Sequence, residues 1–166
     1  MKAVSNTTPL RYLIAIEQEH LLGQLFEKVF VPVAVHEELT DARTPESVRR
    51  RISSLPPWFE VRAVQEAHAT AFPVTLHRGE RQAILLAEAL HADVLLIDEQ
   101  IGRTIALSRN LPLSGTLGVL ERADTMRFVN DFPQILQRLK ASGFFITEAL
   151  EQQLLNRHRA RRGHSS

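Results

Sequence analysis

Short apolar runs alternate with amphipathic stretches along most of the chain. Runs that predict strands lie at 2–5 ("KAVS"), 28–32 ("KVFVP"), 58–64 ("WFEVRAV"), 93–97 ("DVLLI") and 111–114 ("LPLS"). The run at 93–97 is continuously apolar from Val94 to Ile97, which is typical of a strand that is buried on both faces in a parallel sheet. The run at 58–64 alternates between apolar and polar residues, which favours a strand at the sheet edge.

Between these runs, apolar residues recur at the spacing of an amphipathic helix. Helices are expected as two short pieces within 7–25, and over 33–39, 44–55, 78–91, 99–109, from 116 onward, 132–143 and 146–159. Thr7 or Thr8 is expected to cap the first helix, with Pro9 in its first turn, whereas residues 66–77 show no clean period. Because connections between parallel strands are right-handed, this alternation predicts an open, mainly parallel α/β sheet with two closing C-terminal helices.

Length and composition indicate one compact domain. The chain has 166 residues, of which 44% are hydrophobic, so it can bury a core of its own. The absence of cysteine excludes disulfides and thiolate zinc sites, and it fits a cytoplasmic location. No apolar run approaches the ~18 residues of a membrane-spanning helix, so we expect neither a signal peptide nor contact with a membrane.

The C-terminal segment is more basic than the rest of the chain. Twenty basic and 19 acidic residues give a net charge of +1, which does not decide for or against a nucleic-acid partner. Arginines are concentrated in "NRHRARRGHSS" at the C-terminus. We therefore expect a domain over residues 1–155 and a basic, flexible tail over 156–166, which could add sequence-independent affinity for RNA.

Ligands of open α/β sheets bind outside the carboxyl ends of the strands. Few polar residues directly follow the predicted strands at these positions. Asn6 follows the first strand, Asp98 and Glu99 follow the central strand, and Thr116 comes shortly after the last strand. Glu80 shares a helix face with the apolar stripe of its own helix, so it is expected to lean toward the sheet.

A further acid is expected from the helix at 33–39. Glu37 and Glu38 each share a face with apolar neighbours, so spacing does not choose between them.

Carboxylates gathered at one sheet edge repel one another unless a cation lies among them. Carboxylate and amide oxygens are ligands for hard cations such as Mg²⁺ or Mn²⁺, which predicts phosphodiester chemistry. Each acid also has an ordinary structural interpretation: Glu80 as a charge at a helix N-terminus, Asp98 as a helix cap and Glu38 as a solvated residue. Asn6 could simply cap a turn. Glu99, one position past Asp98, is expected to point away from the site.

Five ordered segments together resemble a known family: "VSNTTPL", "VPVAVHEEL", "LHRGERQAILLAEAL", "DVLLIDEQIGRTIA" and "SGTLGVL". Over roughly residues 2–155 the chain resembles the PIN-like domain nucleases, and within them the prokaryotic subgroup of predicted nucleic-acid-binding proteins related to VapC-type toxins. The resemblance implies a Rossmann-like, three-layer α/β/α fold with a cluster that binds Mg²⁺ or Mn²⁺ and cleaves RNA. By motif, that cluster falls on Asn6, Glu38, Glu80 and Asp98, as metal ligands and catalytic residues.

The resemblance implies a hydrolase, specifically a metal-dependent endoribonuclease that is the toxin component of a toxin–antitoxin pair. Asn6 stands where the wider family has Asp, so we expect weakened metal affinity and reduced activity. The alternative is a weak or inactive PIN-like module that binds RNA or protein in a regulatory role. Expected partners are RNA, a small antitoxin protein and a second copy of the chain in a homodimer. Arg103 and Thr116 are candidate contacts to the nucleic acid. Alternatively, Arg103 could pair with an acidic neighbour, and Thr116 could be an ordinary N-cap residue of its helix.

Overall fold

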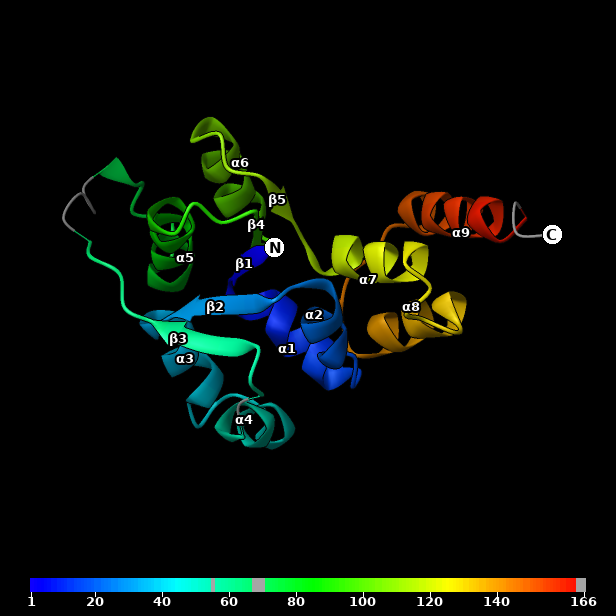
Figure 1. The fold of residues 1–166 in the computed structure, drawn as a ribbon, viewed down its shortest axis with the longest axis horizontal. Coiled ribbons are helices and arrows are strands. Elements are labelled where there is room, and N and C mark those ends of the chain that lie inside the picture. The colour runs from blue at the N-terminus through cyan, green and yellow to red at the C-terminus, as the bar shows by residue number, and fades with distance from the viewer. Residues whose placement is uncertain (55, 67–70, 164–166) are drawn as a thin grey trace.

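The computed structural model describes residues 1–54, 56–66 and 71–163, so the aperiodic segment at 66–77 lies partly outside the described residues. In chain order the elements are β1 (Lys2–Ser5), α1 (Thr7–Ala15), α2 (His20–Leu25), β2 (Lys28–Pro32), α3 (Val33–Thr40), α4 (Glu46–Ser53), β3 (Phe59–Arg62), α5 (Arg78–Ala89), β4 (Val94–Leu96), α6 (Gln100–Ser108), β5 (Leu113–Ser114), α7 (Thr116–Thr125), α8 (Phe132–Ala141) and α9 (Glu148–Gly163) (Figure 1). The predicted alternation of strands and helices is confirmed, with small shifts at the element ends.

The five strands form one parallel sheet in the order β3-β2-β1-β4-β5. The chain starts in the middle with β1, builds outward to β3 at one edge, and then crosses back to add β4 and β5 on the other side. The predicted parallel sheet and the edge position of β3 are therefore confirmed. The direction of winding reverses between β1 and β4, and the carboxyl ends of two such strands border the crevice where open α/β sheets bind ligands.

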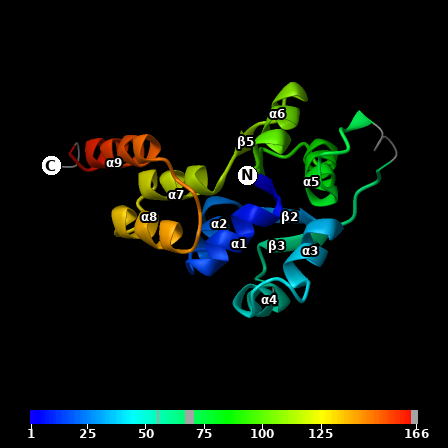
Figure 2. The same ribbon diagram turned by 180° about the vertical axis from the view of Figure 1, so that it is seen from behind.

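Helices cover both faces of the sheet, because successive strand residues point to opposite sides. Ala3 and Leu96 belong to the core cluster that packs against α1, α2, α7 and α8. Val4, Leu95 and Ile97 belong to a second cluster, which packs against α5 and α6. This is the expected three-layer α/β/α arrangement, and the two views show α7, α8 and α9 gathered at one end of the molecule (Figures 1 and 2).

The basic C-terminal segment corrects one expectation. Residues 156–163 are not a flexible extension but the second half of α9. The physical reason is Asp124, a buried carboxylate on α7 that accepts hydrogen bonds from His158, Arg161 and Arg162 of α9. Burial alone would raise the pKa of Asp124, but these bonds hold it below its usual range. The arginines are thus used within the fold to satisfy a buried charge.

The start of α1 corrects a second expectation. The helix begins at Thr7 with Asn6 as its N-cap residue, so neither Thr7 nor Thr8 occupies the capping position. The Asn6 side chain makes no capping hydrogen bond either. These polar side chains at the end of β1 are therefore available for contacts outside α1.

Within the described residues, no helix combines the length and apolar character needed to cross a membrane.

Candidate active site

Asn6 and Asp98 lie at the carboxyl ends of the two neighbouring strands that flank the reversal in winding. Ser5 of β1 is paired with Leu96 of β4, and the backbone N–H of Asn6 donates to the Leu96 carbonyl over 2.9 Å. Asn6 is 3% exposed, so its amide must find partners inside the protein. The sequence-predicted juxtaposition of these two strand ends is present in the structure.

Glu99 lies inside this site, which corrects the expectation that it points away. Its carboxylate accepts a hydrogen bond from the Asn6 side-chain amide over 3.0 Å, and a second from the hydroxyl of Thr8. Glu99 is the N-cap residue of α6 in an extended conformation (φ −68°, ψ 132°) and makes no capping bond to its own helix. The side chain is therefore free to reach across to the end of β1.

Glu80 is the buried acid of the site, with 6% of its surface exposed. One carboxylate oxygen accepts the backbone N–H of His77 over 3.2 Å at the start of α5. Burial raises the pKa of Glu80, and the nearby carboxylates of Glu99 and Glu38 raise it further, against the opposing effect of the His77 N–H. The repulsion shows that three acids from three different elements share one electrostatic environment.

Asp98 is held by the first residue of α7. Its two oxygens accept the backbone N–H of Thr116 over 2.9 Å and the Thr116 hydroxyl over 2.6 Å. Asp98 therefore does not cap the helix that follows it in sequence. Burial raises the pKa of Asp98, and the charge of Glu99 adds to this, whereas Thr116 and Arg103 oppose the rise.

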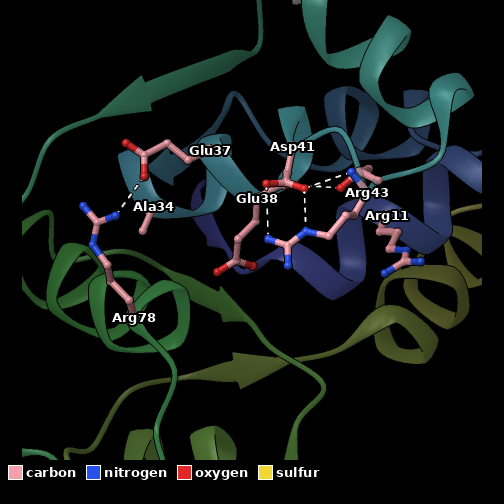
Figure 3. A pocket seen from close by; sticks show the side chains of 8 residues that line it. Arg11, Ala34, Glu37, Glu38, Asp41, Arg43 and Arg78 are labelled. Carbon is pink, nitrogen blue, oxygen red and sulfur yellow. Dashed lines mark hydrogen bonds and ion pairs between the residues drawn. The ribbon is translucent and has the colours of Figure 1, made fainter.

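Glu38 and Glu37 point in different directions from α3, which settles the choice that spacing left open. Glu37 is exposed and forms an ion pair with Arg78 over 2.8 Å, whereas the Glu38 carboxylate points elsewhere (Figure 3). Glu38 accepts the hydroxyl of Thr7 at the start of α1. Glu38, although exposed to solvent, thus lies against Thr7 at the end of β1 and beside Gly79 of α5, whereas Glu37 pairs with Arg78 at the first residue of α5.

Two glycines make room for these carboxylates, a signal that the sequence analysis did not use. A Cβ at Gly79 would lie 2.5 Å from Oε1 of Glu38, and a Cβ at Gly115 would lie 2.4 Å from Oδ1 of Asp98. At both distances a side chain at the glycine would force the carboxylate to move from its present position. Gly79 directly precedes Glu80 and Gly115 directly precedes Thr116, so the glycines of "GE" and "SGT" carry information about the site.

The two candidate nucleic-acid contacts have different surroundings. Thr116 is fully buried and uses both its backbone N–H and its hydroxyl on Asp98, so it orients that carboxylate. Arg103 donates to the Ile97 carbonyl over 2.8 Å and is partly exposed beside Asp98. The guanidinium is thereby fixed at the rim of the site, with further N–H groups able to meet an anion.

The donor set fits a hard divalent cation by its chemistry. The site is formed by Asn6, Glu38, Glu80, Asp98 and Glu99, and a cation would compensate the carboxylates of Glu80 and Asp98, whose pKa values are raised mainly by burial and in smaller part by neighbouring carboxylates. Among the described residues, no three acidic, histidine or cysteine side chains are already arranged to hold an ion. Binding would therefore require side-chain rotation, for example of Glu99, away from the hydroxyl and amide donors that now satisfy these oxygens.

Comparison with known proteins agrees with this geometry. The family described as the PIN domain matches residues 2–160, which is nearly the whole chain. PIN domains are generally nucleases that use divalent metal ions. No curated protein matches the chain. The extent of the family match, together with the five-stranded parallel sheet and its helical layers, shows that the chain belongs to the PIN domain family.

Proposed function

We propose that the protein is a metal-dependent endoribonuclease that uses Mg²⁺ or Mn²⁺, with Asn6, Glu38, Glu80 and Asp98 as ligands. The observation that carries the proposal is the convergence of acids at the carboxyl ends of β1 and β4, where two of them have raised pKa values. The contact between the Glu99 carboxylate and the Asn6 amide supports including Glu99 in the set. Glu99 restores the charge that Asn6 lacks relative to an aspartate.

The chain's own residues supply position and charge. The site residues would hold a divalent ion, which when bound would supply an activated water and stabilise the leaving oxygen of a phosphodiester. Thr116 holds Asp98 in one orientation, and the burial of Glu80 keeps its carboxylate close to the other acids. Arg103, anchored on the Ile97 carbonyl, is placed to meet a phosphate oxygen of the RNA beside Asp98.

We further propose that this activity serves as the toxin component of a toxin–antitoxin pair. In that role the RNA is the substrate, a small antitoxin protein blocks the site, and two copies of the chain form a homodimer. The support is the resemblance to VapC-type toxins, and the proposal is tested separately from the chemistry. Co-expression with a small protein encoded next to this chain should restore growth that the chain alone inhibits; unimpaired growth without it would contradict the toxin role.

A second candidate, a regulatory module that binds RNA or protein without cleavage, is favoured by the bond between Asn6 and Glu99. The amide donor of Asn6 satisfies a carboxylate oxygen of Glu99 in the absence of a cation. If this pairing persists when metal is added, a carboxylate oxygen of Glu99 stays bonded to the amide nitrogen of Asn6 and does not turn toward a cation. The binding module then becomes the better description.

Adjacent glutamates on α3 offer the sharpest test of the nuclease proposal. In an assay with labelled RNA and Mn²⁺, Glu38→Gln should lower the cleavage rate by at least about 10- to 100-fold, the loss typical of residues that support a metal site. Glu37→Gln is the matched control and should leave the rate unchanged, because Glu37 is exposed and paired with Arg78. An Asp98→Asn variant should be inactive. Equal degradation by the wild type, Glu38→Gln and Asp98→Asn would identify a contaminating nuclease and remove the proposal.

A further inference from the structure

A groove of about 450 Å³ runs from Asp98 along α7 to the loop between α8 and α9. We call it the α7–α9 groove. Its lining includes Asp98 and Arg103 beside the candidate active site, Phe145 of the loop between α8 and α9, and Arg157 of α9. The groove is thus continuous with the candidate active site, so a substrate that extends from the site along α7 would lie in the groove.

Two adjacent phenylalanines border the groove, and only one of them has a structural role in the core. Phe144 makes an edge-to-face contact with Tyr12, with ring centroids 5.0 Å apart, and is half-buried against the core. Phe145 is 84% exposed. A large aromatic side chain at the rim of a groove provides a flat apolar face on which an unpaired base can stack.

Charge favours a nucleotide as the occupant. Arg103 stands beside Asp98, and its Nη1 lies 3.4 Å from the position that a Cβ of Gly115 would take, so the missing side chain keeps this end of the groove open. Arg157 of α9 is the second arginine that lines the groove, and it is paired there with Glu121. A nucleotide matches this arrangement, since its base is flat and apolar on its faces and its phosphates are anionic.

We propose that the α7–α9 groove is a subsite for the nucleotide next to the scissile phosphate, whose unpaired base stacks on Phe145. The inference rests on the proposed function, because it takes RNA as the substrate, and it deepens it by requiring an unpaired base at one position. A base within a duplex is already stacked and cannot present its face to the ring.

Binding of a short unstructured RNA that carries 2-aminopurine tests the subsite. The full chain is titrated in Ca²⁺, which replaces Mn²⁺ to limit cleavage, and the fluorescence of the base reports stacking. The wild type should quench the base on binding. Phe145→Ala should weaken binding by about 5- to 100-fold and abolish the quenching, the effect expected for loss of one stacked base, whereas Phe145→Trp should retain both.

Matched controls separate stacking on Phe145 from non-specific apolar binding and from a change in oligomeric state. Phe128→Ala removes a phenylalanine that is also exposed (37%) but lies outside the groove, and it should bind RNA like the wild type. An RNA duplex of the same sequence should bind equally to the wild type and to Phe145→Ala. Size-exclusion chromatography should give the same oligomeric state for both proteins.

The outcomes of the two proposals are distinguishable. If the wild type stacks the base without cleaving RNA in Mn²⁺, base stacking on Phe145 is supported as RNA binding, and the nuclease proposal fails. If the wild type cleaves RNA and Phe145→Ala binds it unchanged, the subsite is overturned while the nuclease stands. The subsite is also overturned if the wild type binds no RNA, or if Phe145→Ala only separates a dimer into monomers, because the groove is then covered by a second copy.

Discussion

Replacing Glu80 by glutamine should stabilise the metal-free protein and abolish its stabilisation by metal. Glu80 is buried, and its pKa is raised by burial and by the carboxylates of Glu99 and Glu38. Glutamine has the same shape and keeps an oxygen that can accept the His77 N–H, but it removes the charge. Relief of a strained functional charge is typically worth about 0.5–2 kcal/mol, which for a chain of this size raises Tm by about 1–8 °C.

The pH dependence identifies the charge as the cause. A carboxyl whose pKa is higher in the folded than in the unfolded state binds more protons when folded, so stability falls as pH rises through the window above its usual value of 4.5. The advantage of Glu80→Gln should therefore be present near neutral pH and shrink as pH approaches the usual value. Glu66→Gln is the control of opposite sign, since its ion pair with Arg81 lowers the pKa of Glu66. Loss of this ion pair in Glu66→Gln should give no increase in the free energy of unfolding at neutral pH.

Calorimetry with EDTA and with Mn²⁺ completes the test. At a Mn²⁺ concentration of about 100 times Kd, binding should stabilise the wild type by about 2.7 kcal/mol. The Glu80→Gln variant should show a much smaller shift. The reasoning is refuted if the variant is less stable than the wild type in EDTA at neutral pH, or if both proteins respond to Mn²⁺ alike.

Two further substitutions probe the site and the fold. Asn6→Asp places a second carboxylate against that of Glu99, so it should lower the Tm in EDTA. The same change should increase Mn²⁺ affinity and the rate of RNA cleavage. Unchanged Mn²⁺ affinity in a titration would show that position 6 is not a ligand. Asp124→Asn leaves Arg161 and Arg162 facing a neutral group, and because these arginines are partly exposed we expect a loss of about 1–3 kcal/mol, with a Tm several degrees lower by calorimetry. An unchanged Tm would contradict the role of Asp124 in anchoring α9.

The architecture could be predicted from the sequence because hydrophobic pattern alone determines it. The run at 94–97 is apolar without interruption and contains β4, an interior strand that pairs with the central strand β1, and the alternating run at 58–64 contains the edge strand β3. Right-handed connections then allow few arrangements of five parallel strands. The position of Asn6 and Asp98 at neighbouring strand ends follows from the same rule.

Individual side chains were harder to predict where the backbone changes from one type of structure to another. Glu99 was expected to point away because neighbouring residues alternate in a strand, but it begins a helix, and alternation no longer applies. Glu37 and Glu38 both flank the apolar face of α3, and only contacts from other elements, Arg78 and Thr7, separate them.

The C-terminal helix shows a missed signal of another kind. Asp124 lies on the same face of α7 as Thr116 and Leu120, at spacings of four, and a carboxylate on a buried face needs a cationic partner. The arginines of the last segment supply it. A basic run is therefore not by itself evidence of a flexible tail when a buried acid elsewhere in the chain remains without a partner.

Direct titration of the protein with Mn²⁺ by calorimetry tests most directly whether these distant side chains surround one cation site. We expect saturable binding by the wild type and by Glu37→Gln, and strongly weakened binding by Glu38→Gln, Glu80→Gln and Asp98→Asn. The account would be contradicted if Glu38→Gln, Glu80→Gln and Asp98→Asn all bound Mn²⁺ with the same affinity as the wild type. It would also be contradicted if the wild type bound no Mn²⁺.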